Sequence, residues 1–253
     1  MRRIVGVVTA MGPGGVRHGN DGWMIVFHLS PWRADDDVVQ KSELRITKAM
    51  SEKDIEKMNK KIDGMAVITL TAHDFTPFHS GQSATLDEVL DFNHDDAEMR
   101  AAAAQLRVPV KVHHHTLGEL KLDRSVNWFS VDLLYGGAIV TLSVDSVDDA
   151  PSPSQLVSAE AIWKDIHSFD ARAKEFASGE LLALKNELWL EEEQEVTEVT
   201  DKEFRNRMTL KWISISDDEE FSFSYSDGEL FWGHAIDITG TVKNGFSDAD
   251  VSG

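Results

Sequence analysis

Residues 221–225 read Phe-Ser-Phe-Ser-Tyr, a strict alternation of aromatic and small polar side chains. Successive side chains of a β-strand point to opposite faces, so this stretch predicts a strand with one buried and one solvated face. Leu210–Ile215 alternates in the same way, and a third strand is predicted from Leu230 to about Val242. The end of the chain is therefore predicted to be an antiparallel sheet whose apolar face needs a covering layer.

The preceding segment predicts that covering layer. Apolar side chains recur there every three or four residues, which is typical of a helix with one buried face: Leu156, Ala159, Trp163, Ile166, Phe169, Ala173 and Phe176. We expect Gly179 to interrupt this helix and Leu181–Leu190 to resume it. Thr200-Asp201-Lys202-Glu203 is a capping box for a further short helix that runs to Met208.

Three more antiparallel strands are predicted before the helices, at Gly118–Asp123, Asn127–Leu134 and Ala138–Asp145. Gly136-Gly137 joins the last two through a tight turn. Residues 116–253 are thus predicted to form an α+β domain with helices on one face of an antiparallel sheet.

The first ninety residues have a different pattern. Predicted elements follow one another as three strands, a helix and two strands: Arg3–Ala10, Trp23–Leu29 closed by Pro31, Glu43–Lys48, a helix from an N-cap at Ser51 to a C-cap at Gly64, Met65–Ala72 and Gln82–Leu86. This is the element order of the small OB-like β-barrel. We predict an OB-like domain over residues 1–92 and a helical connector over 93–115, with its helix at Asp95–Leu106.

The glycine cluster Gly12–Gly15 follows the first predicted strand, as a phosphate-binding loop would. It lacks the Gly-Lys-Ser/Thr ending and precedes a strand, not a helix N-terminus. It therefore predicts a hairpin loop.

The charge of the chain is concentrated in its second half. The formal net charge is -19; residues 126–253 hold 9 basic and 26 acidic side chains, whereas residues 1–125 hold 16 and 18. The acidic stretches include Glu191–Glu198 and Asp217–Glu220. Such a surface repels nucleic-acid phosphates and anionic lipid, and attracts a basic partner. We expect no nucleic-acid or membrane partner; simple solubility is the alternative explanation of the charge.

The chain contains no cysteine, which removes disulfides, thiolate nucleophiles and cysteine-based zinc sites. This fits a reducing compartment. Arg2-Arg3 and the short apolar run after it faintly resemble a secretory signal, but no convincing cleavage pattern follows, and a first β-strand is the preferred interpretation. We expect a cytoplasmic protein without a cofactor.

Three clusters could carry a site. His113 and His115 would share one face of an extended segment and could bind a metal. The simpler alternative is that this segment is a polar linker. Arg124, beside Asp123 and Trp128, could bind an anion. The alternative is that Asp123 and Arg124 form an ion pair that organises a turn.

The third cluster is Asp227-Gly228-Glu229-Leu230-Phe231-Trp232-Gly233-His234. Strand alternation would place Trp232 and His234 on one face with Ile236 and Ile238. His234 is then either a hydrogen-bonded core residue or a general base oriented by Asp227, Asp237 or Glu229.

Several of these motifs occur together in a fixed order: Leu117–Arg124 followed by Trp128-Phe129, then Leu184–Trp189, Asp201–Phe204 and Asp227–His234. As a set they resemble the bacterial domain-of-unknown-function family numbered twenty-two sixty-two, well over residues 116–253 and more loosely before them. The resemblance implies a bacterial origin and brings no catalytic residues.

Two functions from different classes follow from the sequence. The first is a non-enzymatic protein-binding module, of immunity or regulatory type, whose acidic second domain contacts a basic protein. The alternative is an enzyme, or a small-ligand or metal-binding protein, with its site around Trp232 and His234. Nucleic-acid binding by the OB-like half ranks third, because that half is close to neutral.

Overall fold

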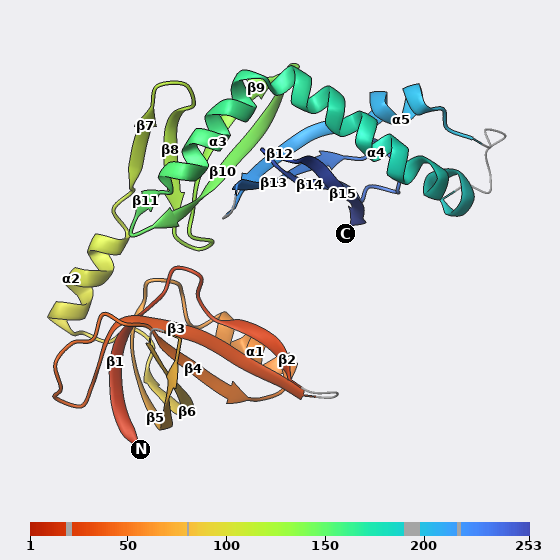
Figure 1. Cartoon of the computed structure of the whole chain (residues 1–253). Helices are drawn as coiled ribbons and strands as arrows, with labels where there is room; N and C mark the ends of the chain where they lie inside the picture. Colours follow the sequence, from red (N-terminus) through yellow and green to blue (C-terminus); the bar gives the residue numbers. More distant parts are fainter. Residues whose placement is uncertain (19–21, 80, 190–197, 217–218) are drawn as a thin grey trace. The chain divides into compact units, whose positions relative to one another are not determined.

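The computed structural model describes residues 1–18, 22–79, 81–189, 198–216 and 219–253 (Figure 1). Contacts divide the chain into two compact units. One comprises Met1–Pro109 with Arg124–Val126, and the other Val110–Asp123 with Asn127–Gly253. Each unit has its own sheet and core, so the protein is a mixed α and β protein with two sheets. Within the described residues, no helix is both long and apolar enough to cross a membrane.

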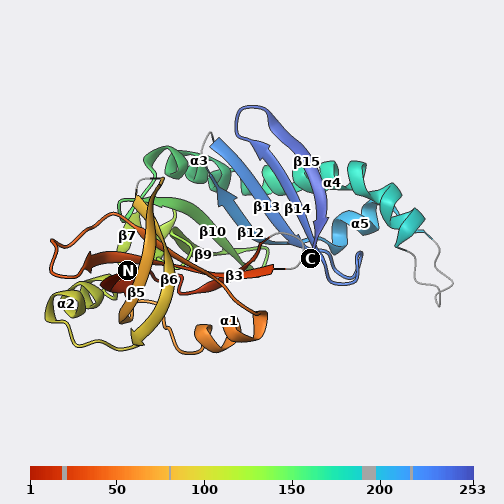
Figure 2. The same cartoon turned by 90° about the horizontal axis from the view of Figure 1, so that it is seen from below.

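The first unit is built on a six-stranded sheet whose pairings return to their starting strand. Its elements are β1 (Arg2–Val8), β2 (Gly14–His18), β3 (Gly22–Ala34), β4 (Leu44–Ala49), α1 (Glu52–Asn59), β5 (Val67–Phe78), β6 (Gly81–Asp91) and α2 (Ala97–Leu106). The order is β1-β5-β6-β4-β3-β2, and β1 also pairs with β3. All these pairs are antiparallel except β4 with β6. Figure 2 gives a second view of these strands.

The predicted elements of this unit are present with shifted ends. Ser51 caps α1 as predicted, since its hydroxyl accepts the N–H of Asp54 at 3.2 Å. The helix ends at Asn59 and not at Gly64, although Ile62 beyond its end is buried in the core. β3 continues past Pro31, where the sequence predicted its end. The Gly12–Gly15 region was predicted to be a hairpin loop, but Gly14 and Gly15 are the first residues of β2 and pair with β3.

Helix α2, the helix of the predicted connector, packs on the first unit. Its buried Met99 and Ala103 form a small cluster with Val5, Val7 and Val67. Arg33 of β3 forms ion pairs with Asp96, the N-cap of this helix, and with Glu98. An apolar contact and two ion pairs therefore fix α2 to this sheet.

The second unit has a nine-stranded sheet in the order β15-β14-β13-β12-β10-β9-β8-β7, with β11 paired to β10. Its strands are β7 (Lys111–His114), β8 (Gly118–Asp123), β9 (Trp128–Tyr135), β10 (Ala138–Val147), β11 (Ala150–Pro151), β12 (Thr209–Ile215), β13 (Glu220–Ser226), β14 (Ala235–Thr241) and β15 (Gly245–Ser252). The sequence predicted a purely antiparallel sheet. This prediction is wrong at one pairing, because β10 and β12 run parallel.

Helices cover one face of this sheet. α3 (Pro153–Lys164) packs on β10 and β12, and α4 (Ile166–Leu188) packs on β14 and β15 (Figure 1). The short helix α5 (Asp201–Arg207) begins with the predicted capping box between Thr200 and Glu203. The alternation in β13 is confirmed, since Phe221, Phe223 and Tyr225 are buried under the helices.

The break between the two long helices does not lie where the sequence predicted it. α3 ends at Lys164 and α4 begins at Ile166, whereas Gly179 lies inside α4. A glycine inside a helix costs about 1 kcal/mol relative to alanine. The buried neighbours Ala177, Ser178 and Leu181 anchor α4 on both sides of Gly179, so packing outweighs that cost.

Strands β7 and β15 have no counterpart in the predicted set. β15 carries Asp248 and Asp250, and aspartate is disfavoured in strands. Pairing along the whole of β14 overrides that preference. β7 lies in the segment around His113 that was predicted to be a linker, and it pairs with β8.

A buried carboxylate ties α4 to the sheet. Asp170 of α4 accepts hydrogen bonds from the hydroxyls of Tyr225 at 3.0 Å and of Tyr135 at 3.1 Å. The Nζ of Lys174, one turn later, lies 3.1 Å from the same carboxylate. Burial, and then the negative charge of Asp170, raise the pKa of Tyr135 to about 12 and that of Tyr225 still further.

These are the only two tyrosines of the chain, so a phenolate titration reports on this cluster alone. We expect almost no phenolate absorbance at pH 10, where an ordinary tyrosine is about half ionised. Tyr135 should titrate at about pH 12. A raised folded-state pKa means that the stability it contributes is complete below about pH 10 and is lost as the pH rises towards 12.

The variant Asp170→Asn removes the negative charge and should move the first phenolate midpoint down towards 10, without reaching it because burial remains. Glu175→Gln, an exposed acidic position on the same helix, is the matched control and should leave the midpoint unchanged. A folded wild-type protein that titrates at the ordinary tyrosine pKa would contradict this description of the cluster.

Candidate functional site

The residues 227–234 and Trp189 form a surface feature that we call the aromatic loop. Gly228, Glu229, Trp232 and Gly233 all have positive φ angles, so the backbone turns repeatedly before β14 begins at Ala235. The prediction that a strand starts at Leu230 is therefore wrong. Trp232 and His234 do not share a strand face with the buried Ile236 and Ile238.

The carboxylate of Asp227 organises this loop. Asp227 is buried, and its oxygens accept the backbone N–H groups of Glu229 at 3.2 Å, Phe231 at 2.6 Å and Gly233 at 3.1 Å. Hydrogen bonds to a charged acceptor are about twice as strong as neutral ones. They stabilise four residues in the left-handed region, two of which are not glycine.

Aromatic rings gather around Trp189, the residue that ends α4. Its ring centroid lies 4.7 Å from Trp232, 5.3 Å from His234 and 5.5 Å from Phe231. Phe231 is fully buried, whereas Trp232 is 57% exposed. The loop therefore inserts one aromatic side chain into the core and presents another to solvent.

The imidazole of His234 is half-buried, and its orientation is fixed. Its Nδ1 lies 2.6 Å from the carbonyl oxygen of Phe231, and because a carbonyl only accepts, Nδ1 carries the proton. In the neutral ring the other nitrogen, Nε2, is then an acceptor. The carboxylate of Asp227 binds backbone instead, and Asp237 accepts the hydroxyl of Ser252. Among the described residues, no carboxylate hydrogen-bonds to His234.

The predicted cluster of Asp123, Arg124 and Trp128 is divided: Asp123 and Trp128 lie on β8 and β9 of the second sheet, whereas contacts group Arg124 with the first unit. Asp123 ends β8 and pairs with Trp128, the first residue of β9. Asp123 and Arg124 both have interaction partners within the chain. Trp128 is half-buried and meets the ring of Trp212 edge-on at 6.1 Å. Trp128 and Trp232 thus belong to separate aromatic pairs.

The histidine run splits between two environments. His113 is exposed on β7 opposite Glu119, whereas His115 lies past the strand end with Nε2 2.8 Å from Glu160 of α3. The hydroxyl of Thr116 and the Nζ of Lys164 also bind Glu160 and lower the pKa of that carboxyl to about 2. Within the described part of the chain, no three His, Asp or Glu side chains converge as metal ligands would.

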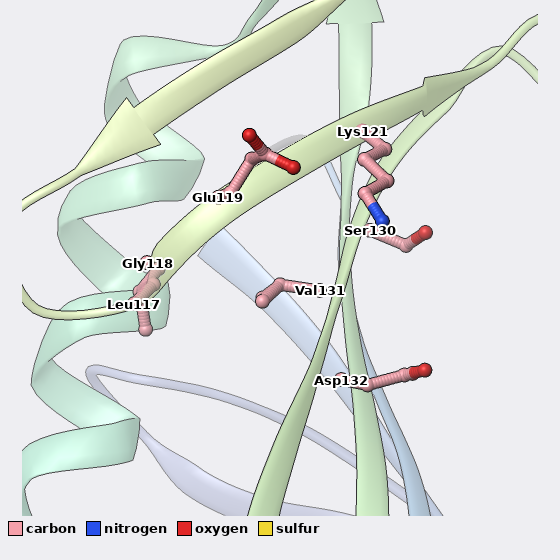
Figure 3. A pocket seen from close by; sticks show the side chains of 7 residues that line it. All are labelled: Leu117, Gly118, Glu119, Lys121, Ser130, Val131 and Asp132. Carbon is pink, nitrogen blue, oxygen red and sulfur yellow. The ribbon is translucent and has the colours of Figure 1, made fainter.

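A separate shallow hollow of about 380 Å³ lies over β8 and β9. Its polar lining comes from Glu119, Lys121, Ser130 and Asp132 (Figure 3). Ser130 and Asp132 extend to one side of β9 and Val131 to the other, as strand alternation requires. Lys111 binds Glu119 at 3.0 Å, and the hydroxyl of Thr141 binds Asp132 at 2.8 Å.

Sequence reasoning missed Trp189 and Trp212. Trp189 stands at a helix end that long-range packing brings to the loop, and no local pattern signals this contact. Of the predicted acidic stretches, residues 191–197 and 217–218 lie outside the described residues; Glu198, Glu219 and Glu220 are exposed.

The fold and the aromatic loop define a protein with two units, each with its own sheet, and with exposed tryptophan on the second. A family described as "Uncharacterized protein conserved in bacteria (DUF2262)" matches residues 114–251, more than half of the chain. The chain belongs to this family, as its motifs predicted. Residues 1–106 match a different family, described as "Domain of unknown function (DUF7021)", so the looser resemblance does not extend to them. No curated protein and no solved structure matches the chain.

The variant Asp227→Asn tests the role of the loop carboxylate. One oxygen becomes an amide NH₂ that cannot accept a backbone N–H, so the free energy of unfolding should fall by about 1–3 kcal/mol. Urea denaturation followed by tryptophan fluorescence measures this, because Trp189 and Trp232 lie at the loop. Glu229→Gln, an exposed position in the same loop, is the control and should unfold like the wild type. Equal stability of Asp227→Asn and wild type would refute this role.

Proposed function

We propose that this protein is a non-enzymatic protein-binding module of the bacterial cytoplasm, of immunity or regulatory type, and that the aromatic loop binds a basic protein. The observation that carries the proposal is the exposed Trp232, packed on Trp189 and held on a turn that Asp227 fixes. Cytoplasmic location is supported by the absence of cysteine from the sequence.

The exposed indole has the properties of a binding hot spot. Tryptophan is enriched among residues that dominate binding energy, and it buries a large area at low entropic cost. A rigid loop also loses little conformational entropy on binding. The face of an indole further attracts Lys and Arg side chains through cation–π interaction.

The net charge of residues 126–253 favours a basic partner. Five glutamates occur between residues 191 and 198, directly after Trp189 in the sequence. Residues 126–253 carry 26 acidic and only 9 basic side chains. This charge speeds encounter with a cationic protein and opposes binding of nucleic acid or anionic lipid.

The second candidate function is an enzyme, or a small-ligand or metal-binding protein, with its site at Trp232 and His234. The hydrogen bond from Nδ1 of His234 to Phe231 favours it, because it leaves Nε2 able to accept a proton or bind a metal. Metal analysis of untagged protein, together with the stability of His234→Ala and His234→Gln, separates this function from the first. Bound metal, or folded variants that lose an activity while partner binding persists, would favour the second function.

We also propose that the first unit is an OB-like barrel, with domains at 1–92 and 116–253 and the helical segment 93–115 between them. The pairings β1–β3, β3–β4, β4–β6, β6–β5 and β5–β1 support this, because they form a closed ring. α1 lies between β4 and β5, where an OB-like domain places its helix. Nucleic-acid binding by this unit remains third, since residues 1–125 carry 16 basic and 18 acidic side chains.

Co-purification from the native host, at low and high salt, tests the docking proposal. A basic protein should be captured at low salt and released at high salt, because screening weakens contacts between exposed charges. With that protein purified, Trp232→Ala should weaken binding by about 30-fold or more, the effect of losing a hot spot.

Trp212→Ala is the matched control, since Trp212 is also partly exposed but belongs to the sheet. It should bind the partner like the wild type. Failure to capture any salt-sensitive partner, or equal losses in both variants, would overturn the proposal.

A further inference from the structure

The face of the second sheet opposite the helices carries a continuous row of small hydroxyl side chains. The strand register places these residues directly side by side, one on each of five neighbouring strands: Ser130, Ser143, Ser214, Ser222 and Thr239. We call them the hydroxyl row. Lys121 precedes it on β8 and Asp248 follows it on β15.

A second row runs parallel to the first on the same face. It contains Asp132, Thr141, Trp212, Ser224 and Asp237 in register. Trp212 is partly exposed and donates its Nε1–H to the hydroxyl of Ser143 at 2.9 Å. The indole of Trp212 therefore lies along the hydroxyl row, and the ring of the half-buried Trp128 meets it edge-on.

Two hollows lie at the two ends of the hydroxyl row. One is the hollow of Figure 3, which includes Lys121, Ser130 and Asp132. The other, of about 230 Å³, is lined by six hydroxyl residues and a single charged one, Glu220: Ser214, Ser216, Ser222, Thr239, Thr241 and Ser247. Among the described residues, the hydroxyls of Ser214 and Ser222 bond to no other side chain.

We propose that this face binds a neutral, linear oligosaccharide laid across the strands. Ser143 is buried and accepts the indole N–H of Trp212, but the other four hydroxyls of the row can each donate and accept a hydrogen bond, which matches the hydroxyls of a sugar. Neighbouring strands are about 4.8 Å apart, close to the length of one hexose unit, so successive sugars can meet Ser214, Ser222 and Thr239 on β12, β13 and β14. Trp212 offers an apolar face to the C–H face of a sugar ring.

The charges on this face select against other ligands. Glu220, Asp237 and Asp248 repel an anion, and among the residues that the structure describes no lysine or arginine lines the second hollow. Accessible hydroxyls on neighbouring strands beside a partly exposed indole fit a polyhydroxylated chain, because polar groups can fix its orientation and the aromatic ring supplies apolar contact. This inference is independent of the docking at Trp232.

The test is isothermal titration of the full chain with xylotetraose, cellotetraose, maltotetraose and tetra-N-acetylchitotetraose. At least one should bind, and the affinity should be insensitive to salt because the ligand is uncharged. Ser222→Val removes a hydroxyl but keeps a good strand former, and should weaken binding by about 3- to 10-fold. Trp212→Ala should abolish binding.

Two controls separate this site from a general effect. Ser226→Ala removes an exposed hydroxyl of β13 that lies outside the row, and Trp232→Ala removes the aromatic loop's exposed ring. Both should bind the oligosaccharide like the wild type. Circular dichroism checks that every variant is folded. No binding of any of the four sugars at millimolar concentration, or binding that Ser222→Val leaves unchanged, would overturn the proposal, as would salt-sensitive binding of a basic peptide at this face in place of the sugar.

Discussion

The buried carboxylate of Asp227 is the constraint on which the surface chemistry of the second unit depends. Three backbone N–H groups converge on it, and they hold a loop in which Glu229 and Trp232 adopt left-handed angles. Each such angle in a residue other than glycine costs roughly 1–2 kcal/mol, a cost that hydrogen bonds to a charged acceptor offset. These hydrogen bonds fix the backbone turns that direct Phe231 into the core and Trp232 towards solvent.

The same unit offers two aromatic surfaces of different chemistry. Trp232 and Trp189 pack together at the aromatic loop, and an acidic stretch follows Trp189 in the sequence, which suits a positively charged macromolecule. Trp212 and Trp128 lie on a regular sheet beside hydroxyl side chains, with Asp132 and Asp237 in the same row as Trp212, which suits an uncharged ligand better than an anion. Loop and sheet therefore provide distinct recognition surfaces on one core.

Local patterns in the sequence predicted most elements, because each depends on its own period or cap. The alternation at Phe221–Tyr225, the Ser51 cap and the Thr200 capping box are all present. The errors arise where distant contacts decide. β15 forms because β14 lies beside it, and Gly179 stays helical because its neighbours are buried. The face of Trp232 was mispredicted since one carboxylate imposes turns that alternation cannot show.

The single parallel pairing in the second sheet, between β10 and β12, has a consequence for how this unit folds. On one side of this pairing, short connections join β7, β8, β9 and β10 in sequence order. On the other side, short connections join β12, β13, β14 and β15 in the same way. Residues 148–208, with most of the helices, separate the two halves. Each half can form through local contacts, whereas joining them closes a long loop and is slow. Until β10 and β12 pair with each other, their facing edges are open to pairing with other chains, so folding of this unit should be sensitive to protein concentration.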